Sequence, residues 1–481
     1  MRIAFVVPEC DPFAKVGGLA DVAGSLPRAL RALGQEGALF LPKYASIPAS
    51  LLVGAQARGE LRVRSGAIDR TVRLLEARLG EVPVFLLDEP GLFGRAGVYG
   101  ENGLDYPDNA ERFAVLSLGA LLAMERLGFA PEAIHAHDWP AALVPAYRRA
   151  LGLHRKAGVL FTIHNLAYQG VFEKEVLPRL GIPGDFFTVD GLEFYGKANF
   201  LKGALHLSTL LNTVSPTYAR EIQEAEHGAG LDGILRARAR DLTGILNGID
   251  LEVWDPAGDG ALPAKFSAED PSGKRKCKNR LQRELKLDVD RETPLFGAIG
   301  RLDPQKGFDL LAEVAPYLLD RGAELAVLGT GQEAIARSLR ALAGERPARG
   351  SVTIGFSAPL ARRIYGGADF FLMPSRFEPC GLGQMIAMRY GTIPVVRATG
   401  GLADTVRDAD EDPDRGNGFV FRDFSADSFR EAIDRALTAF EKRARLDRLV
   451  ARAMREDFSW ERSARAYLDL YGEAARREAA R

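Results

Sequence analysis

Lys15 and a neighbouring pair of glycines form the first group of residues in the sequence that could bind a ligand. Lys15 precedes Gly17 and Gly18, and an apolar-periodic helix is predicted to begin at this pair. The backbone N–H groups of such a turn and the N-terminus of the helix attract an anion, and Lys15 would add a positive charge. A tight turn before a core helix explains the glycines equally well. Asp21, one turn into the helix, could contact a sugar or an acceptor, or it could stabilise the helix dipole.

Arg301 and Lys306 form a second cationic group, five residues apart in the segment GRLDPQKG. A planar guanidinium beside a point-charged ammonium suits a diphosphate leaving group when no metal neutralises it. Two surface cations at a turn are the alternative interpretation.

Glu378 follows a predicted strand in the segment PSRFEPCGLGQM, in which Gly381 and Leu382 open the next helix. A carboxylate beside backbone N–H groups could bind vicinal sugar hydroxyls and a phosphate together. The segment TGGLADTV, residues 399–406, repeats the order of strand, glycine pair and helix.

Three histidines lie at the ends of two predicted strands. His135 and His137 belong to the segment IHAHDWPA, and His164 belongs to FTIHNLAYQG. A metal site is a weak interpretation, because no ligating Cys or His pair lies nearby. Histidine and asparagine at strand ends also bind hydroxyl groups, which suits a sugar.

Short apolar runs rich in Val, Ile, Leu and Phe precede these motifs and alternate with helical stretches, a pattern typical of parallel sheets in α/β domains. We therefore predict two doubly wound domains that face each other, with the motifs at the carboxyl ends of their strands in a shared cleft. The predicted strands are residues 3–7, 38–41, 84–87, 134–136, 159–163 and 210–214, then 295–299, 325–328, 352–354, 370–373, 393–396 and 418–421.

The segments between and after these domains have distinct patterns. Residues 255–273 are rich in Pro, Gly, Asp and Ala and lack periodicity, so we place the domain boundary near residues 247–255. The basic run 273–280 predicts the solvated start of a helix rather than a nucleic-acid address. Residues 460–473 predict an amphipathic helix docked on one of the domains.

Composition excludes several classes of protein. The 481 residues include 63 Lys and Arg against 64 Asp and Glu, so no basic field draws the chain to nucleic acid or an anionic membrane. None of the three cysteines has zinc-ligand spacing, and no run of eighteen apolar residues predicts a membrane span. The N-terminal residues lack the pattern of a signal peptide, so a cytoplasmic protein is expected.

Taken in order, the motifs KVGGLADV, HAHDW, TIHN with LAYQG, VSPTYA, LNGID, GRLDPQKG, PSRFEPCGL and TGGLADTV closely resemble those of bacterial glycogen synthases and plant starch synthases. The resemblance extends from Met1 to about Tyr471. It implies a GT-B architecture with a Rossmann-like domain in residues 1–247, a second in 248–457, and a C-terminal helix in 458–481 that crosses back to the first domain.

The same resemblance implies an activity. Glucose would pass from ADP-glucose to the nonreducing 4-hydroxyl end of an α-1,4-glucan such as glycogen, with retention of the anomeric configuration and without a metal. ADP-glucose would be a substrate and no cofactor would be needed. Neither nucleic acid nor membrane is an expected partner, and the oligomeric state is left open.

Residue by residue, the resemblance assigns the diphosphate to Lys15 and Gly18, and the departing ADP to Arg301 and Lys306. His164 would hold the glucosyl unit and stabilise positive charge at its anomeric carbon. The expected sugar-binding residues are Asn165, Glu378, Cys380 and Gly381, the last two through their backbone. Further positions that line the site in the family are Asp21, Tyr99, Asp138 and Asn247.

The sequence departs from the family pattern in two places. Ile386 stands where related retaining transferases often have a second Glu, so Glu378 would work without a carboxylate partner. Gly383 replaces the usual Thr of EPCGLTQ, which removes a hydroxyl near the phosphates or ribose and leaves the nucleotide preference open. Phe356 stands where an aromatic ring commonly packs on adenine, although a core position explains it as well.

Three alternatives compete with this interpretation. A retaining transferase could use UDP-glucose or a different acceptor, and a noncatalytic glucan-binding relative could keep the same fold. An NAD-dependent oxidoreductase is excluded, because the first strand is not followed by GxGxxG. Retention could arise by front-face attack or through a covalent step, for which Glu378 is the motif carboxylate.

Overall fold

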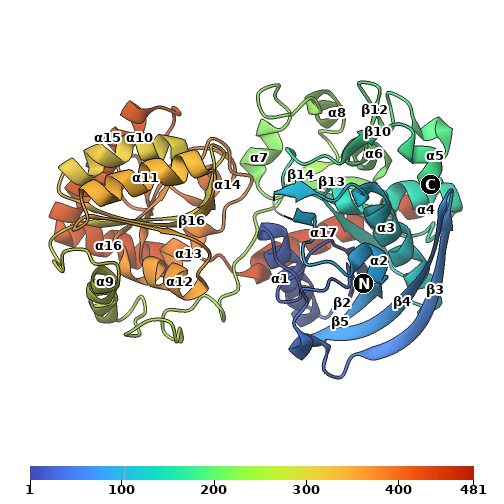
Figure 1. Cartoon of the computed structure of the whole chain (residues 1–481), viewed down its shortest axis with the longest axis horizontal. Helices are drawn as coiled ribbons and strands as arrows, with labels where there is room; N and C mark the ends of the chain where they lie inside the picture. The colour runs from blue at the N-terminus through green and yellow to red at the C-terminus, as the bar shows by residue number, and fades with distance from the viewer. Residues whose placement is uncertain (102, 481) are drawn as a thin grey trace. The chain divides into compact units, whose positions relative to one another are not determined.

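The computed structural model describes residues 1–101 and 103–480, which form two α/β units (Figure 1). The first unit comprises Met1–Gly248 together with Trp460–Arg481. The second unit comprises Ile249–Ser459. The C-terminal segment therefore belongs to the unit that also contains the N-terminus.

A nine-stranded sheet forms the centre of the first unit. Its strands are β1 (Arg2–Val6), β2 (Glu36–Pro42), β3 (Gln56–Ser65), β4 (Ile68–Leu79), β5 (Val82–Asp88), β8 (Ala133–His137), β9 (Gly158–Ile163), β13 (Leu210–Thr213) and β14 (Leu242–Gly244). Their order across the sheet is β14-β13-β9-β8-β1-β2-β5-β4-β3. The strands from β14 to β5 are parallel, and β4 and β3 extend the sheet as an antiparallel hairpin. The chain changes direction across the sheet between β1 and β8, which makes their carboxyl ends a topological switch point.

Helices cover both faces of this sheet. The helices of the unit are α1 (Gly18–Ala32), α2 (Pro90–Phe93), α3 (Asn109–Arg126), α4 (Val144–Leu151), α5 (Val176–Leu180), α6 (Phe200–Leu207), α7 (Pro216–Glu221), α8 (Asp232–Ala237) and α17 (Trp460–Ala479). The helix α17 contacts α1, β8 and β9, and α1 also packs on β2. A separate group consists of α3 and α4, and in this group α3 contacts β1, β2 and β5. The small additional strands are β6 (Gly100–Glu101) with β7 (Leu104–Asp105), and β10 (Val171–Glu173) with β12 (Lys197–Asn199) and β11 (Glu193–Phe194).

The second unit has a six-stranded parallel sheet of Rossmann order. Its strands are β15 (Leu295–Leu302), β16 (Glu324–Gly331), β17 (Gly350–Ile354), β18 (Phe370–Met373), β19 (Ile393–Arg397) and β20 (Phe419–Phe421). Their order is β17-β16-β15-β18-β19-β20, so the switch point lies between β15 and β18. The helices are α9 (Ser272–Glu284), α10 (Phe308–Asp320), α11 (Glu333–Glu345), α12 (Ala358–Gly367), α13 (Gly383–Arg389), α14 (Gly400–Thr405), α15 (Ala426–Glu441) and α16 (Arg443–Met454).

Each of the twelve predicted strands overlaps an observed strand of one of these sheets, so the prediction of parallel α/β units is confirmed. The hairpin β3–β4 was not among the predicted strands. Its buried residues, such as Leu61 and Val63, alternate with exposed arginines such as Arg62, because one face of the hairpin meets solvent.

The basic run 273–280 lies in α9, but the expectation that it is solvated is wrong for two of its lysines. Lys278 is buried, with its Nζ 2.6 Å from Asp369 Oδ2. The Nζ of Lys274 donates to Thr392 Oγ1 at 2.7 Å, and burial lowers the pKa of Lys274 to about 7. Both lysines turn inward because α9 packs on α12.

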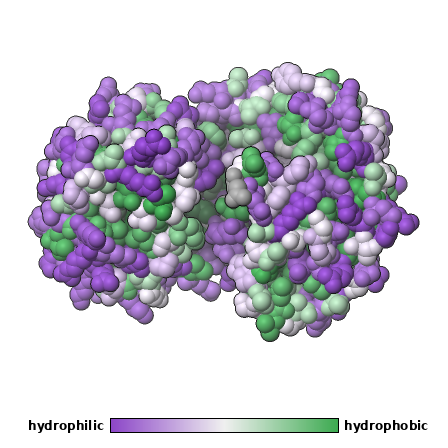
Figure 2. All heavy atoms as spheres, in the orientation of Figure 1, coloured by the Kyte–Doolittle hydropathy of each residue, from purple (hydrophilic) through white to green (hydrophobic). Residues whose placement is uncertain are grey.

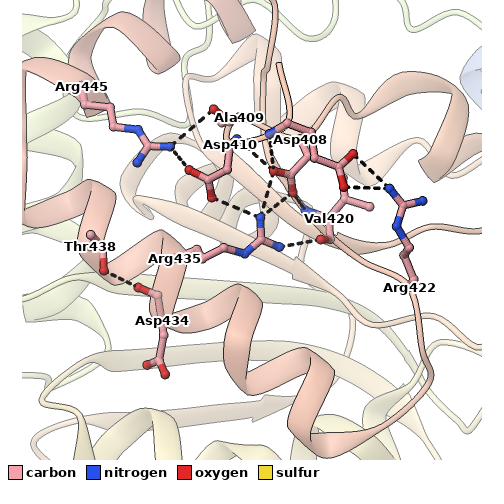
Figure 3. A network of polar contacts seen from close by, with 10 residues as sticks. Asp408, Ala409, Asp410, Val420, Arg422, Asp434, Arg435, Thr438 and Arg445 are labelled. Carbon is pink, nitrogen blue, oxygen red and sulfur yellow. Dashed lines mark hydrogen bonds and ion pairs between the residues drawn. The ribbon is translucent and has the colours of Figure 1, made fainter. Parts of the chain in front are cut away.

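An acidic loop before β20 is tied to the two helices that follow that strand (Figure 3). Asp408 accepts hydrogen bonds from Val420 N at 2.7 Å and from Arg435 Nη1 of α15 at 2.7 Å. Burial raises the pKa of Asp408, but these hydrogen bonds outweigh burial and hold it below its ordinary value. Asp410 in turn pairs with Arg445 of α16. The loop is thus part of the packed structure rather than a loose connection.

On the face shown in Figure 2, hydrophilic residues cover most of both units and hydrophobic residues occur in small groups. Within the described part of the chain, every helix is too short or too polar to cross a bilayer.

Candidate active site

The loop between β1 and α1 carries the first predicted group. Lys15 Nζ lies 2.5 Å from Asp21 Oδ1 and 3.1 Å from Asp11 Oδ2. Burial lowers the pKa of Lys15, but the two carboxylates outweigh burial and raise it above its ordinary value. The amine of Lys15 is therefore protonated and positively charged, and Asp21 is its ion-pair partner.

The glycine pair at the start of α1 is not required by the backbone. Gly17 is extended, with φ −144° and ψ −167°, and Gly18 also lacks a positive φ. A Cβ on Gly18 would meet no atom within 4 Å. The tight-turn explanation of these glycines therefore fails, and the space beside Gly18 is open.

Glu9 is a residue of this loop to which the sequence analysis gave no role. Its Oε2 accepts hydrogen bonds from Val16 N at 2.6 Å and Gly17 N at 2.9 Å, and its Oε1 accepts one from Tyr99 Oη at 3.0 Å. The side chain is only 3% exposed, and burial raises its pKa. Glu9 thus holds the glycine loop and connects it to Tyr99. Its position could have indicated a role, since Glu9 lies in the loop after β1 as Glu378 lies in the loop after β18.

His164, Asp138 and Asn165 lie together at the carboxyl ends of β8 and β9. Asp138 has φ 54°, an uncommon angle for a residue with a Cβ, and its Oδ1 accepts a hydrogen bond from His164 N at 2.7 Å. Burial raises the pKa of Asp138 to about 8, although hydrogen bonds from the backbone of His164 and Asn165 partly oppose this shift. Asp138 therefore fixes the backbone at the end of β9.

The ring of His164 forms a hydrogen bond with the ring of His137. His137 Nδ1 lies 2.9 Å from His164 Nε2, and His164 is 9% exposed. Burial lowers the pKa of His164 to about 3, so the ring is neutral. In the part of the chain that the structure describes, no three His, Cys, Asp or Glu side chains are grouped as metal ligands.

Glu378 and Lys306 meet at the switch point of the second unit. Lys306 Nζ donates to Glu378 Oε1 at 2.8 Å and to Oε2 at 2.6 Å, and Ser375 Oγ donates to Oε2 at 3.2 Å. Glu378 is 4% exposed. Arg301 lies on β15 close by in sequence, partly exposed, with Nη1 3.4 Å from Asp303 Oδ2. The structure thus joins two predicted groups that lie 72 residues apart.

Glycines shape the loop that presents Glu378. Gly307, just before α10, has φ 70°, and a Cβ there would lie 1.9 Å from Pro374 O. The pair Gly400–Gly401 packs on the same loop, since a Cβ on Gly401 would lie 2.0 Å from Cys380 O. The segment TGGLADTV therefore supports the Glu378 loop by close backbone approach.

The remaining predicted residues of this loop have mixed environments. Cys380 is buried, Gly381 has φ 73°, and Leu382 is the N-cap residue of α13. A Cβ on Gly383 would lie 3.1 Å from the Phe371 ring, so tight packing provides a reason for glycine there that the sequence did not show. Ile386 is part of the core.

Two further predicted residues lie apart from these groups. Asn247 is buried near the end of the first unit, and its Oδ1 has no hydrogen-bond partner among the described residues. Phe356 follows β17 with 91% of its surface exposed, so a core position is excluded.

Comparison with known proteins shows the family of the chain. Residues 2–237 match the family described as "Starch synthase catalytic domain", and residues 281–450 match "Glycosyl transferases group 1". The glycogen synthase of Geotalea uraniireducens is 44% identical over 98% of each chain, and that of Anaeromyxobacter dehalogenans strain 2CP-C is 48% identical over 98% of this chain and 99% of its own. The chain belongs to the glycogen and starch synthase family.

Two solved structures share the fold of this chain. The catalytic domain of starch synthase IV from Arabidopsis thaliana bound to ADP and acarbose matches with a TM-score of 0.92 and 34% identity over 99% of both chains. The sucrose-phosphate synthase of Thermosynechococcus elongatus matches with a TM-score of 0.60 at 18% identity over 98% of both chains, which shows the fold alone. The predicted GT-B fold class with two Rossmann-like domains is confirmed.

Proposed function

We propose that the chain transfers glucose from ADP-glucose to the nonreducing 4-hydroxyl end of an α-1,4-glucan, with retention and without a metal or other cofactor. The observation that carries this proposal is the Lys306–Glu378 pair at a Rossmann switch point, in a chain 48% identical to a glycogen synthase. The related starch synthase bound to ADP and acarbose supports the choice of nucleotide and the class of acceptor.

Cations from both units would bind the diphosphate. Lys15 and the open N-terminus of α1 belong to the first unit, whereas Arg301 and Lys306 belong to the second. The open space beside Gly18 would allow a phosphate to approach the backbone closely. Since bond cleavage places negative charge on ADP, cations held in these positions would lower the barrier.

The environment of Glu378 favours front-face attack over a covalent step. Lys306 donates to both oxygens of this carboxylate and Ser375 to one of them, which reduces its nucleophilicity. In front-face attack, the bond between C1 and the phosphate oxygen breaks and its electron pair leaves with ADP. The glucan 4-hydroxyl oxygen bonds to C1 on the same face, and its proton passes to the departing phosphate.

His164 would act as a neutral group in this reaction. Because burial lowers its pKa to about 3, its ring can exchange a hydrogen bond with a sugar hydroxyl without carrying charge. Glu378, fixed by Lys306, would accept hydrogen bonds from other hydroxyls of the same glucosyl unit.

The decisive experiment measures nucleotide release from ADP-glucose with and without glycogen, in EDTA and without added metal, with UDP-glucose in parallel. We expect release that depends on glycogen and on ADP-glucose. Release from UDP-glucose alone would overturn the proposed donor and direct attention to Phe356. No release from either donor by folded protein would favour a glucan-binding protein.

A further inference from the structure

Two buried histidines of the first unit are joined by a single hydrogen bond. His137 at the end of β8 and His164 after β9 are joined by the 2.9 Å contact between His137 Nδ1 and His164 Nε2. Burial lowers the pKa of both rings, so both are neutral at ordinary pH. A neutral imidazole has one N–H and one lone pair. One ring nitrogen of this contact therefore donates and the other accepts.

The direction of this hydrogen bond decides what His164 offers to a ligand. His164 Nε2 is occupied by His137, so Nδ1 is the ring nitrogen left to meet a sugar. If His137 donates, His164 Nε2 is an acceptor and Nδ1 carries the proton. If His164 donates instead, its Nδ1 presents a lone pair.

The ring of His135 packs on the ring of His137, with centroids 3.8 Å apart and the two planes tilted by 35°. Other neighbours determine the tautomer of His135. Asn212 Nδ2 donates to the carbonyls of Thr213 and Thr243, so Asn212 Oδ1 is an acceptor and takes the hydroxyl proton of Thr162 at 2.9 Å. Since the Thr162 hydroxyl donates its proton to the hydrogen bond with Asn212, its Oγ1 can only accept a hydrogen bond from His135. His135 Nε2, which lies 2.6 Å from Thr162 Oγ1, therefore carries the proton.

The second nitrogen of His135 is occupied by the C-terminal helix. With the proton on Nε2, His135 Nδ1 accepts a hydrogen bond from Tyr471 Oη of α17 at 2.8 Å. Both nitrogens of His135 thus have hydrogen-bond partners, and neither is left to bond with His137.

The other nitrogen of His137 decides the direction. His137 Nε2 is buried and has no hydrogen-bond partner among the described residues. A proton on this nitrogen would be a buried N–H without an acceptor, and such orphaned donors are rarer in proteins than unpaired acceptors. The proton of His137 therefore belongs on Nδ1, where His164 Nε2 accepts it.

We propose that His137 is a positioning residue: it donates from Nδ1 to His164 Nε2 and so holds His164 as the tautomer that presents an Nδ1–H to the glucosyl unit. This inference rests on the proposed function for the identity of the ligand. The tautomer itself is a property of the free protein. A sugar oxygen would then accept a hydrogen bond from the N–H of His164 Nδ1, instead of facing a lone pair on that nitrogen.

The tautomer is tested on the full chain labelled with ¹⁵N at its six histidines. Long-range proton–nitrogen spectra separate protonated from unprotonated imidazole nitrogens, and loss of signals in His164→Gln assigns the ring. We expect His164 Nε2 at the unprotonated position and Nδ1 at the protonated position, without any substrate. The opposite assignment would overturn the proposal whatever the activity.

The positioning role is tested with matched variants. In His137→Asn the amide nitrogen replaces the Nδ1 donor, whereas His137→Phe keeps a ring without a donor. We expect His137→Phe to reverse or mix the His164 tautomer and to lower kcat by about 10–100-fold, as for other groups that orient a ligand-binding histidine. His137→Asn should restore the tautomer and most of kcat.

Tyr471→Phe is the control, because it disturbs the same cluster at His135 but leaves the His137–His164 contact in place. It should lower stability without changing the His164 tautomer. Unchanged kcat in His137→Phe, or a restored tautomer without restored kcat in His137→Asn, would overturn the positioning role. An inactive wild-type chain with the expected tautomer would contradict the proposed function alone.

Discussion

At the scale of single residues, Lys306 has two roles, and both depend on its positive charge. Its ammonium compensates a Glu378 carboxylate that is 4% exposed, and it is the proposed partner of the leaving phosphate. A buried carboxylate without its cation is costly, so the pair should be sensitive to loss of either member.

We expect Lys306→Ala to lower kcat for glucosyl transfer by about 10²–10³-fold, as when one donor to a developing negative charge is removed. Initial rates of ADP release at saturating substrates measure this. Lys276→Ala, at an exposed position on α9, is the control and should leave the rate unchanged. Urea unfolding in parallel separates lost stability from lost chemistry. A kcat close to wild type would contradict the account of the leaving group.

Asp138 predicts a dependence of stability on pH. Burial raises its pKa from 3.8 to about 8, so between these values the folded protein keeps a proton that the unfolded chain releases. The contribution of this group to stability therefore falls as pH rises from about 4 to about 8 and is constant above. Asp138→Asn cannot titrate there. We expect the stability of the variant relative to wild type to increase from pH 5.5 to pH 8, as measured by urea unfolding at both values. If the free energy of unfolding changed equally with pH in both proteins, the raised pKa of Asp138 would be refuted.

At the scale of elements, the Glu378 loop depends on the start of α14. Gly401 N donates to Glu378 O at 3.1 Å, and no side chain fits between the two segments. The glycine pair is thus a packing requirement of the site rather than a second anion-binding turn.

Gly401→Ala should destabilise the second unit by about 1–3 kcal/mol, because its Cβ would overlap the Cys380 carbonyl and force the Glu378 loop to move. Activity should fall together with stability. Gly344→Ala in α11 is the matched control, since a Cβ there meets nothing within 4 Å, and helix propensity should make it neutral or stabilising by up to about 1 kcal/mol. Equal urea midpoints for the two variants would refute the packing argument.

The C-terminal helix α17 belongs to the first unit through polar as well as apolar contacts. Tyr467 Oη donates to Asn212 Oδ1 at 2.9 Å, and Tyr471 reaches His135. These partners lie on β13 and on β8, and β8 also carries His137. The helix α17 additionally packs on β9, the strand that His164 follows.

At the scale of the whole molecule, the proposed diphosphate ligands lie on different units, Lys15 on the first and Lys306 on the second. If both lysines bind one diphosphate, ADP links the two units and favours a closed arrangement. We expect small-angle scattering to show a smaller radius of gyration at saturating ADP than without it. Lys15→Ala should weaken this compaction and adenosine should not cause it. An unchanged radius with ADP would count against binding by both units.

The local signals in the sequence determined the two parallel sheets and the motifs at their ends. Strands buried on both faces are continuous apolar runs, and loops that begin helices are marked by glycines, so both can be recognised from neighbouring residues alone. The hairpin β3–β4 was not predicted, because its apolar residues alternate with arginines. A search for continuous apolar runs does not detect such a half-buried strand.

The tertiary structure alone decided how the motifs are combined. The contacts of Lys306 with Glu378, of His137 with His164 and of Tyr471 with His135 join residues that lie 72, 27 and 336 positions apart. Nothing local encodes such pairs, because they depend on which strands become neighbours in the sheet. Burial likewise emerges only from packing, and it is burial that keeps the histidines neutral and raises the pKa of Asp138.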